Sequence, residues 1–148
     1  DCLIDIINIF LREGQNYVIS APVWEYFSED INSKEIIGLI NEIKIDKENG
    51  FCGKTIIHPS QIKYVNSLYA VTYEEYIDAK NIIRSCNDGG VFKGYGGNKM
   101  NEVKPHFNWA KKIMSRAKIF GVLNEKVSNE ELYKENDKYN FSNKPIEI

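Results

Sequence analysis

The sequence is poor in the residues that build metal clusters and disulfide frameworks. Its 148 residues include two histidines, His58 and His106, and three cysteines. Cys2, Cys52 and Cys86 are odd in number and scattered, which fits neither a disulfide framework nor a zinc-binding pattern. The two histidines also lack the spacing of metal ligands. These absences favour a reducing, cytoplasmic location and argue against a zinc site built from this protein alone.

Long hydrophobic runs and an excess of one charge are also missing. No apolar stretch approaches the roughly 20 residues of a membrane-spanning helix. The 19 basic and 21 acidic residues leave a net charge of −2, so no basic field attracts nucleic acid or an anionic membrane. No secretory leader opens the chain, yet Asp1 is not a methionine and an apolar pattern begins at once. We therefore expect further chain upstream.

Hydrophobic periodicity predicts alternating helices and strands in the first part of the chain. A helical pattern covers 3–10, and a short apolar run at 17–21 predicts a buried strand. Ser33 can cap a second helix, 55–57 is typical of a second strand, and Pro59 suits the first turn of a third helix. This order indicates an α/β fold with parallel strands. Two strands cannot cover a parallel sheet, so we expect a slice of a larger barrel or open sheet.

The second part of the chain changes character. Thr72 and Glu75 form a capping box that starts a helix reaching about Cys86. A glycine-rich segment follows, and Pro105 then opens a helix that Gly121 ends. Ser128 and Glu131 can cap one more short helix, and polar residues dominate from Lys134 onward. The predicted organisation is part of a barrel at 1–86, a glycine-rich linker and C-terminal helix at 87–123, and a polar tail at 124–148.

The sharpest feature is the segment 53–59, which reads GKTIIHP. A strand that ends in a polar residue and leads directly into a helix is typical of a catalytic face, because active sites gather at the C-terminal ends of parallel strands. His58 lies at that end, and Lys54 at the opposite end supports structure or binds substrate. The alternative is that this segment is only a turn, in which Lys54 is solvated and His58 does no more than hydrogen-bond the start of the helix. Packing is likewise the alternative role for Trp24. The candidate substrate-binding residues are Lys54, His58, Pro59, Trp24 and Glu25.

The segment 50–62 is similar to a signature of citrate lyase β-subunits and malyl-CoA lyase relatives, in the HpcH/HpaI aldolase superfamily. It reads GFCGKTIIHPSQI. Residues 20–27, SAPVWEYF, and 98–106, NKMNEVKPH, resemble one branch, the C–C bond lyases of the TIM-barrel fold found with tellurium-resistance gene clusters. The resemblance covers roughly 1–123.

The resemblance implies the C-terminal part of a TIM (β/α)8 barrel, about strands seven and eight, with a C-terminal helical extension. It implies a lyase or aldolase that acts on a 2-oxo or 3-hydroxy acid or its CoA thioester, with the use of CoA left open. It also implies Mg²⁺ on a Glu and an Asp, and an Arg that holds the substrate oxyanion. Those segments lie before position 1, so we expect no metal ligands in this chain.

The resemblance assigns a catalytic role to Glu102. Related malyl-CoA lyases carry an acid on a C-terminal extension that reaches a neighbouring subunit's site, which implies a homo-oligomer. Here Glu stands where Asp is expected, with one extra residue before Pro105. A carboxylate there can move a proton beside a carbonyl. The alternative is a negative charge that only favours the start of the following helix.

Two other kinds of function stay open. A non-catalytic barrel fragment with an added tail can serve as an assembly or interaction module. A nucleotide-binding protein rests only on Gly94, Gly96 and Gly97, which no strand precedes and no Gly-Lys-Ser/Thr follows, so a flexible loop is the expected role of these glycines.

Overall fold

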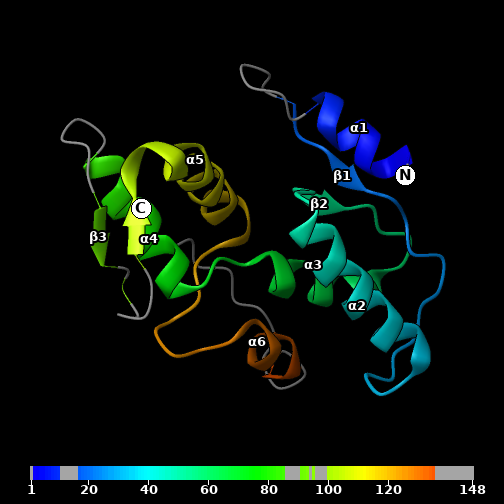
Figure 1. Cartoon of the computed structure of the whole chain (residues 1–148). Coiled ribbons are helices and arrows are strands. Elements are labelled where there is room, and N and C mark those ends of the chain that lie inside the picture. The colour runs from blue at the N-terminus through cyan, green and yellow to red at the C-terminus, as the bar shows by residue number, and fades with distance from the viewer. Residues whose placement is uncertain (1, 11–16, 86–90, 94, 96–99, 136–148) are drawn as a thin grey trace. The chain divides into compact units, whose positions relative to one another are not determined.

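The computed structural model describes residues 2–10, 17–85, 91–93, 95 and 100–135 (Figure 1). Contacts divide the chain into two compact units, 1–69 and 70–148. The boundary falls after Tyr69, inside the segment predicted as part of a barrel, and the predicted three-part organisation stays a prediction. No helix of the described residues is both long and apolar enough to cross a membrane.

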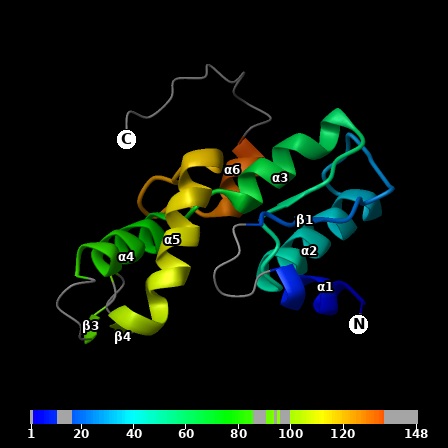
Figure 2. The same ribbon diagram turned by 90° about the horizontal axis from the view of Figure 1, so that it is seen from above.

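The first unit is a two-stranded parallel sheet with helices. It consists of α1 (Cys2–Phe10), β1 (Ser20–Ala21), α2 (Lys34–Glu48), β2 (Gly53–Lys54), a 3-10 turn (Pro59–Gln61) and α3 (Ile62–Tyr69). The strands β1 and β2 are parallel, with Ser20 opposite Gly53 and Ala21 opposite Lys54. The helices α2 and α3 contact each other and β2 (Figures 1 and 2). The predicted α/β alternation with parallel strands is confirmed for these residues.

Both strands are shorter than the sequence predicts. At the first strand, Tyr17 and Val18 are 58% and 78% exposed, so the predicted burial of the whole run is wrong and only Ala21 is fully buried. The second strand lies two residues earlier than predicted. Thr55 N–H still bonds Ala21 C=O, but Ile57 N–H bonds the side chain of Gln61 instead of a strand. Without a ladder partner for Ile57, the strand ends before it.

The helices of the first unit follow their sequence signals. Ser33 caps α2 by accepting from Ile36 N–H, as predicted. The turn at Pro59 continues directly into α3, so Pro59 occupies the first turn, as predicted. The core of this unit contains apolar residues of α2 and α3 together with two fully buried tyrosines: Ile36, Leu39, Ile43, Tyr64, Val65, Leu68 and Tyr69.

The second unit is a helix pair with a short antiparallel hairpin. It consists of α4 (Tyr73–Arg84), β3 (Val91–Lys93), β4 (Met100–Glu102), α5 (Val103–Phe120) and α6 (Asn129–Glu135). The strands β3 and β4 pair antiparallel. The sequence did not predict them, and the glycines expected to form a loop, at 94, 96 and 97, lie outside the described residues. The polar tail from 136 onward lies outside them as well.

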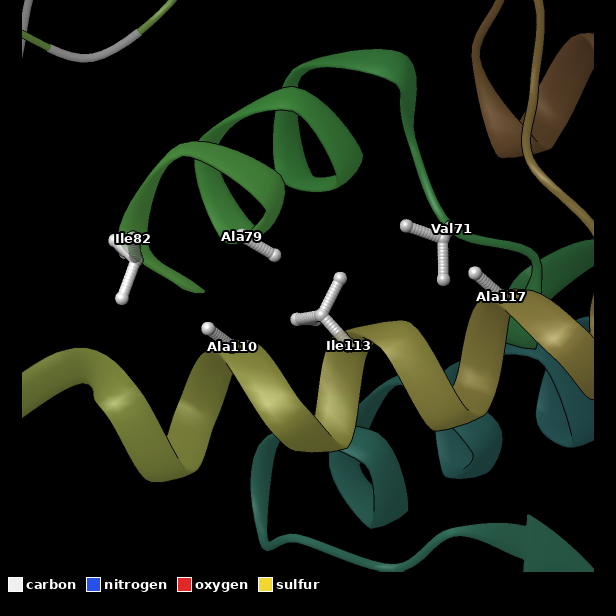
Figure 3. Close-up of a cluster of buried hydrophobic side chains, with 6 residues drawn as sticks. All are labelled: Val71, Ala79, Ile82, Ala110, Ile113 and Ala117. Carbon is white, nitrogen blue, oxygen red and sulfur yellow. The ribbon is translucent and has the colours of Figure 1, made fainter. Parts of the chain in front are cut away.

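The helices α4 and α5 pack on each other through small and branched side chains. Figure 3 shows Ile82, Ala79 and Val71 facing Ala110, Ile113 and Ala117 across the pair. Small residues let the two helices approach closely. At the end of α5, Gly121 has a φ of 81° and stops the helix, as predicted. The predicted capping boxes of α4 and α6 are both confirmed.

Candidate active site

The candidate site consists of the two loops that follow β1 and β2. Because the strands are parallel, the loops at 22–27 and 55–58 leave the sheet at the same edge. Of the predicted substrate-binding residues, Trp24, Glu25 and His58 lie on these loops, and Pro59 begins the 3-10 turn that follows. The structure therefore brings these four residues to one edge of the sheet, where parallel α/β folds place their ligands.

His58 is the most tightly oriented of the four residues. Its Nδ1 accepts from Ser60 N–H at 3.3 Å, which makes His58 the N-cap of the helical turn, and it lies 2.9 Å from Ser60 Oγ. One face of the imidazole stacks on Phe27, with ring centroids 4.0 Å apart and planes 11° apart. An Nδ1 that accepts from a backbone amide leaves the proton of the neutral ring on Nε2. His58 thus presents Nε2–H as a hydrogen-bond donor from a fixed ring.

Trp24 is held against α2. Its Nε1–H donates to Glu35 C=O at 3.0 Å, and its ring lies over Gly38. A Cβ added at Gly38 would meet Trp24 Cζ2 at 2.5 Å, so the ring can occupy this place only because that residue is glycine. Trp24 also makes an edge contact with Tyr26. The packing role that the sequence left open for Trp24 is therefore present, and contact with a ligand stays a prediction.

Glu25 and Pro59 are exposed at the same edge. The neighbouring side chains there are largely apolar, since Tyr26, Phe27 and Ile57 are 57%, 52% and 56% exposed. These exposed aromatic and branched side chains belong to the same two loops as Glu25 and His58, and contact of any of them with a substrate stays a prediction.

Lys54 is buried and points to α2. Its side chain is 0% exposed, and its Nζ lies 2.7 Å from Asp46 Oδ2 and 2.6 Å from Glu42 Oε1. The two carboxylates are four residues apart and so lie on one face of α2. Structural support was one of the two roles that the sequence predicted for Lys54, the other being substrate binding. This geometry gives Lys54 the structural role. The predicted position of Lys54 at the far end of a strand is wrong, because β2 ends at Lys54.

Gln61 is the residue of this site that the sequence analysis overlooked. It is fully buried, and its amide bonds both loops. The signal was present, because a Gln three residues after a helix N-cap completes a capping box. The box is formed here with His58 as its first member.

Glu102 lies in the second unit as the last residue of β4. Its side chain is outside the described residues, so its predicted catalytic role stays a prediction.

The pKa of Tyr95, in the same unit, is raised, chiefly by the hydrogen bond that its hydroxyl donates to Glu125.

The family resemblance implies Mg²⁺, which makes clustered metal-ligand side chains the feature of interest among the described residues. No group of three or more His, Cys, Asp or Glu among them could hold a metal ion. One pair of neighbouring carboxylates, Glu42 and Asp46, bonds the ammonium of Lys54. Where the Mg²⁺ that the family resemblance implies would bind stays a prediction.

Comparison with known proteins identifies the family. A model described as C-C bond lyase of the TIM-barrel fold matches residues 1–122, and the chain belongs to this family. The chain is 36% identical over 94 residues to the citrate lyase subunit beta of Leuconostoc mesenteroides subsp. cremoris, and 30% identical over 91 residues to that of Escherichia coli strain K12. These alignments cover 64% and 60% of the chain but 30% of each relative. No solved structure matches the chain.

Proposed function

We propose that this chain supplies part of the substrate-binding edge of a carbon–carbon bond lyase or aldolase. The substrate class is a 2-oxo or 3-hydroxy acid, or its CoA thioester. Family membership and the citrate lyase relatives support a lyase function. The chain spans 30% of the length of those relatives, so the activity is proposed for a barrel that contains this chain as its seventh and eighth strands.

The observation that carries the proposal is the orientation of His58. The imidazole stands at the C-terminal edge of two parallel strands, with Nδ1 engaged and Nε2–H as the remaining donor. A donor so fixed can bind a carboxylate or the carbonyl oxygen of a substrate. The stack on Phe27 keeps the ring in one plane. His58 is thus a candidate for positioning the acid, and the exposed carboxylate of Glu25 is a candidate acceptor for a substrate hydroxyl.

Metal dependence belongs to the proposal. We propose that the Mg²⁺ ligands belong to segments outside this chain, as the family resemblance implies. Whether the acid enters free or as a CoA thioester is left to experiment. A cytoplasmic location and a homo-oligomer are further parts of the proposal, the first from the scattered cysteines and the second from the resemblance around Glu102.

Replacement of His58 tests the proposal, with a matched pair of variants. His58→Asn keeps the helix cap, because an Asn side chain also accepts from Ser60 N–H, but it removes the Nε2 donor. His58→Ala removes both the cap and the donor. Turnover would be measured on a panel of 3-hydroxy acids and their CoA thioesters, in the protein that contains this chain and the metal-binding segments.

If His58 binds substrate, both variants lower kcat/KM by roughly 10–100-fold, the value of one hydrogen bond to a charged group. If His58 is only a cap, His58→Asn restores wild-type turnover and the proposal fails. Absence of cleavage for every member of the panel by the wild-type protein also contradicts it.

Glu102 is proposed as a general acid or base carried by the second unit. In the same protein, Glu102→Gln keeps the shape and removes the titrating group, so kcat falls by about 10²–10⁴-fold with little change in substrate affinity. If subunits share sites, mixing this variant with subunits that lack the metal carboxylates restores activity. Wild-type turnover of the variant leaves Glu102 as a charge at a helix start.

A second candidate function is a non-catalytic interaction module, favoured by the surface of α1. Five large apolar side chains of this helix, Leu3, Ile4, Ile6, Ile9 and Phe10, are 38–51% exposed. Apolar surface of this extent marks a contact region. Substituting Ile4 and Ile9 by Lys discriminates the two candidate functions. An interaction module loses self-association in sedimentation experiments, whereas a substrate-binding edge keeps its affinity for substrate.

A further inference from the structure

Gln61 joins the two loops of the candidate site. Its Nε2 donates to Trp24 C=O at 3.0 Å and to Tyr26 C=O at 2.9 Å, both in the loop after β1. Its Oε1 accepts from Ile57 N–H at 3.0 Å and from His58 N–H at 3.4 Å, both in the loop after β2. The side chain is fully buried. Both amide protons and both lone pairs of the oxygen therefore have partners.

The capping box explains only a part of this arrangement. A Gln at the third position of a helix is expected to reach back to the backbone N–H of the cap, which is the bond to His58. It is not expected to donate to carbonyls 37 and 35 residues earlier in the chain. These two bonds take the place of a strand ladder beyond the point where β1 and β2 stop pairing. They fix the distance between the loops.

We propose that Gln61 is a positioning residue that locks the loop after β1 to the loop after β2 and so holds the ring of His58 on Phe27. The lock depends on an amide, since a carboxylate offers no proton to Trp24 or Tyr26 and an apolar side chain bonds neither loop. Without these bonds the part-buried carbonyls and amides of the two loops lose their partner, which frees the loops rather than the helix that follows them.

The test uses NMR of the 148-residue chain, and no ligand is needed. The chain has two histidines, so the ring protons of His58 are distinguished from those of His106 by a single variant. Stacking on Phe27 displaces the His58 ring signals upfield, and Phe27→Leu gives the position without the stack. We expect Gln61→Met to move the His58 signals to the Phe27→Leu position. Asn66→Met, at an exposed position of α3, is the matched control and leaves them in place.

The variant Gln61→Glu tests whether the amide itself is needed, because it keeps the length of the side chain. At neutral pH the introduced carboxylate repels both carbonyls, and the His58 signals lie at the unstacked position. Wild-type His58 signals in a folded Gln61→Met chain would overturn the proposal.

A measurement on the wild-type chain keeps the proposal testable if both variants unfold. The amide protons of Ile57 and His58 lie outside regular ladders, yet the lock predicts that they exchange with solvent as slowly as amides of α3. Exchange at the rate of the exposed Glu25 amide would contradict the lock.

Turnover distinguishes this proposal from the proposed function, on which only its kinetic consequence rests. If both hold, Gln61→Met lowers kcat/KM, and combining it with His58→Ala adds little further loss because both act through the same ring. If the His58 signals move but turnover does not, the lock stands and the role of His58 in catalysis fails.

Discussion

Each of the two units of this chain has an apolar core, and the units differ in the polar groups that join their elements. In the first unit, buried polar groups join the elements: Lys54 pairs with Asp46 and Glu42, and Gln61 bonds both loops. In the second unit, α4 and α5 meet through an apolar cluster, and the capping boxes of α4 and α6 lie near the helix ends. The polar ties occur where the backbone leaves regular structure, beside the candidate site. Hydrogen bonds, which are directional, orient that site.

The tryptophans allow this comparison to be measured, because the sequence has two and each unit contains one. Trp24 lies in the first unit, and Trp109 packs against the apolar cluster of the second. Fluorescence in a Trp109→Phe background therefore reports the first unit, and fluorescence in a Trp24→Phe background reports the second.

The largest effect on stability is expected from Lys54→Met. This change leaves Asp46, whose side chain is 8% exposed, without its buried cation. Breaking a buried pair by removing one partner costs about 3–5 kcal/mol of unfolding free energy. Urea unfolding followed through Trp24 measures it. Lys34→Met, at a side chain that is 92% exposed, is the control and stays within about 0.5 kcal/mol of wild type.

A large effect confined to the second unit is expected from Ile113→Ala. Ile113 is 3% exposed at the centre of the contact between α4 and α5 (Figure 3). Its truncation costs about 2–5 kcal/mol through lost burial and the cavity left behind. The Trp109 signal should show this loss. Ile119→Ala on the same helix, at a residue that is 71% exposed, should leave the signal unchanged.

A smaller effect is expected from Gly38→Ala, which introduces a methyl group 2.5 Å from the ring of Trp24. Overpacking costs about 1–3 kcal/mol, and the higher helix propensity of Ala offsets up to about 1 kcal/mol of it. We expect a net loss and a red-shifted Trp24 emission as the ring moves toward solvent. Gly53→Ala is the control, because nothing lies within 4 Å of its added Cβ. An unshifted Trp24 emission would show that the loop tolerates the methyl group.

The smallest effect is a change in titration. The hydrogen bond to Glu125 raises the pKa of Tyr95, so this contact stabilises the fold below the ordinary pKa of about 10 and is lost as the pH rises through the raised value. Glu125→Gln should bring the pKa of Tyr95 down toward 10 in an NMR titration of its ring carbons. An unchanged pKa would mean that the contact does not form in solution.

Local sequence signals predicted the helices and their ends, because an N-cap depends on residues three positions apart and a helix stop on a single glycine. Ser33, Thr72 and Gly121 act as the pattern indicates. The strand ends could not be predicted in this way. The end of β2 depends on the hydrogen bond that Gln61 Oε1 accepts from Ile57 N–H. The orientation of the Gln61 side chain depends in turn on its tertiary contact with the loop after β1.

The candidate site shows the same limit. A strand followed by His58 and Pro59 predicted the edge at which the loops meet, since the rule for parallel sheets needs only element order. The burial of Lys54 was not predicted, although the apolar stripe of α2 through Leu39 and Ile43 continues to Asp46. A carboxylate on a buried stripe indicates a cationic partner, but sequence spacing alone does not say which lysine supplies it.

The central claim is that His58 binds substrate and does not only cap a helix. The most direct test compares kcat/KM of wild type, His58→Asn and His58→Ala in the protein that contains this chain and its metal-binding segments. Both variants are expected to lose roughly 10–100-fold in kcat/KM, because Asn preserves the cap but offers no Nε2–H. Wild-type kcat/KM in His58→Asn, with a loss only in His58→Ala, would contradict it.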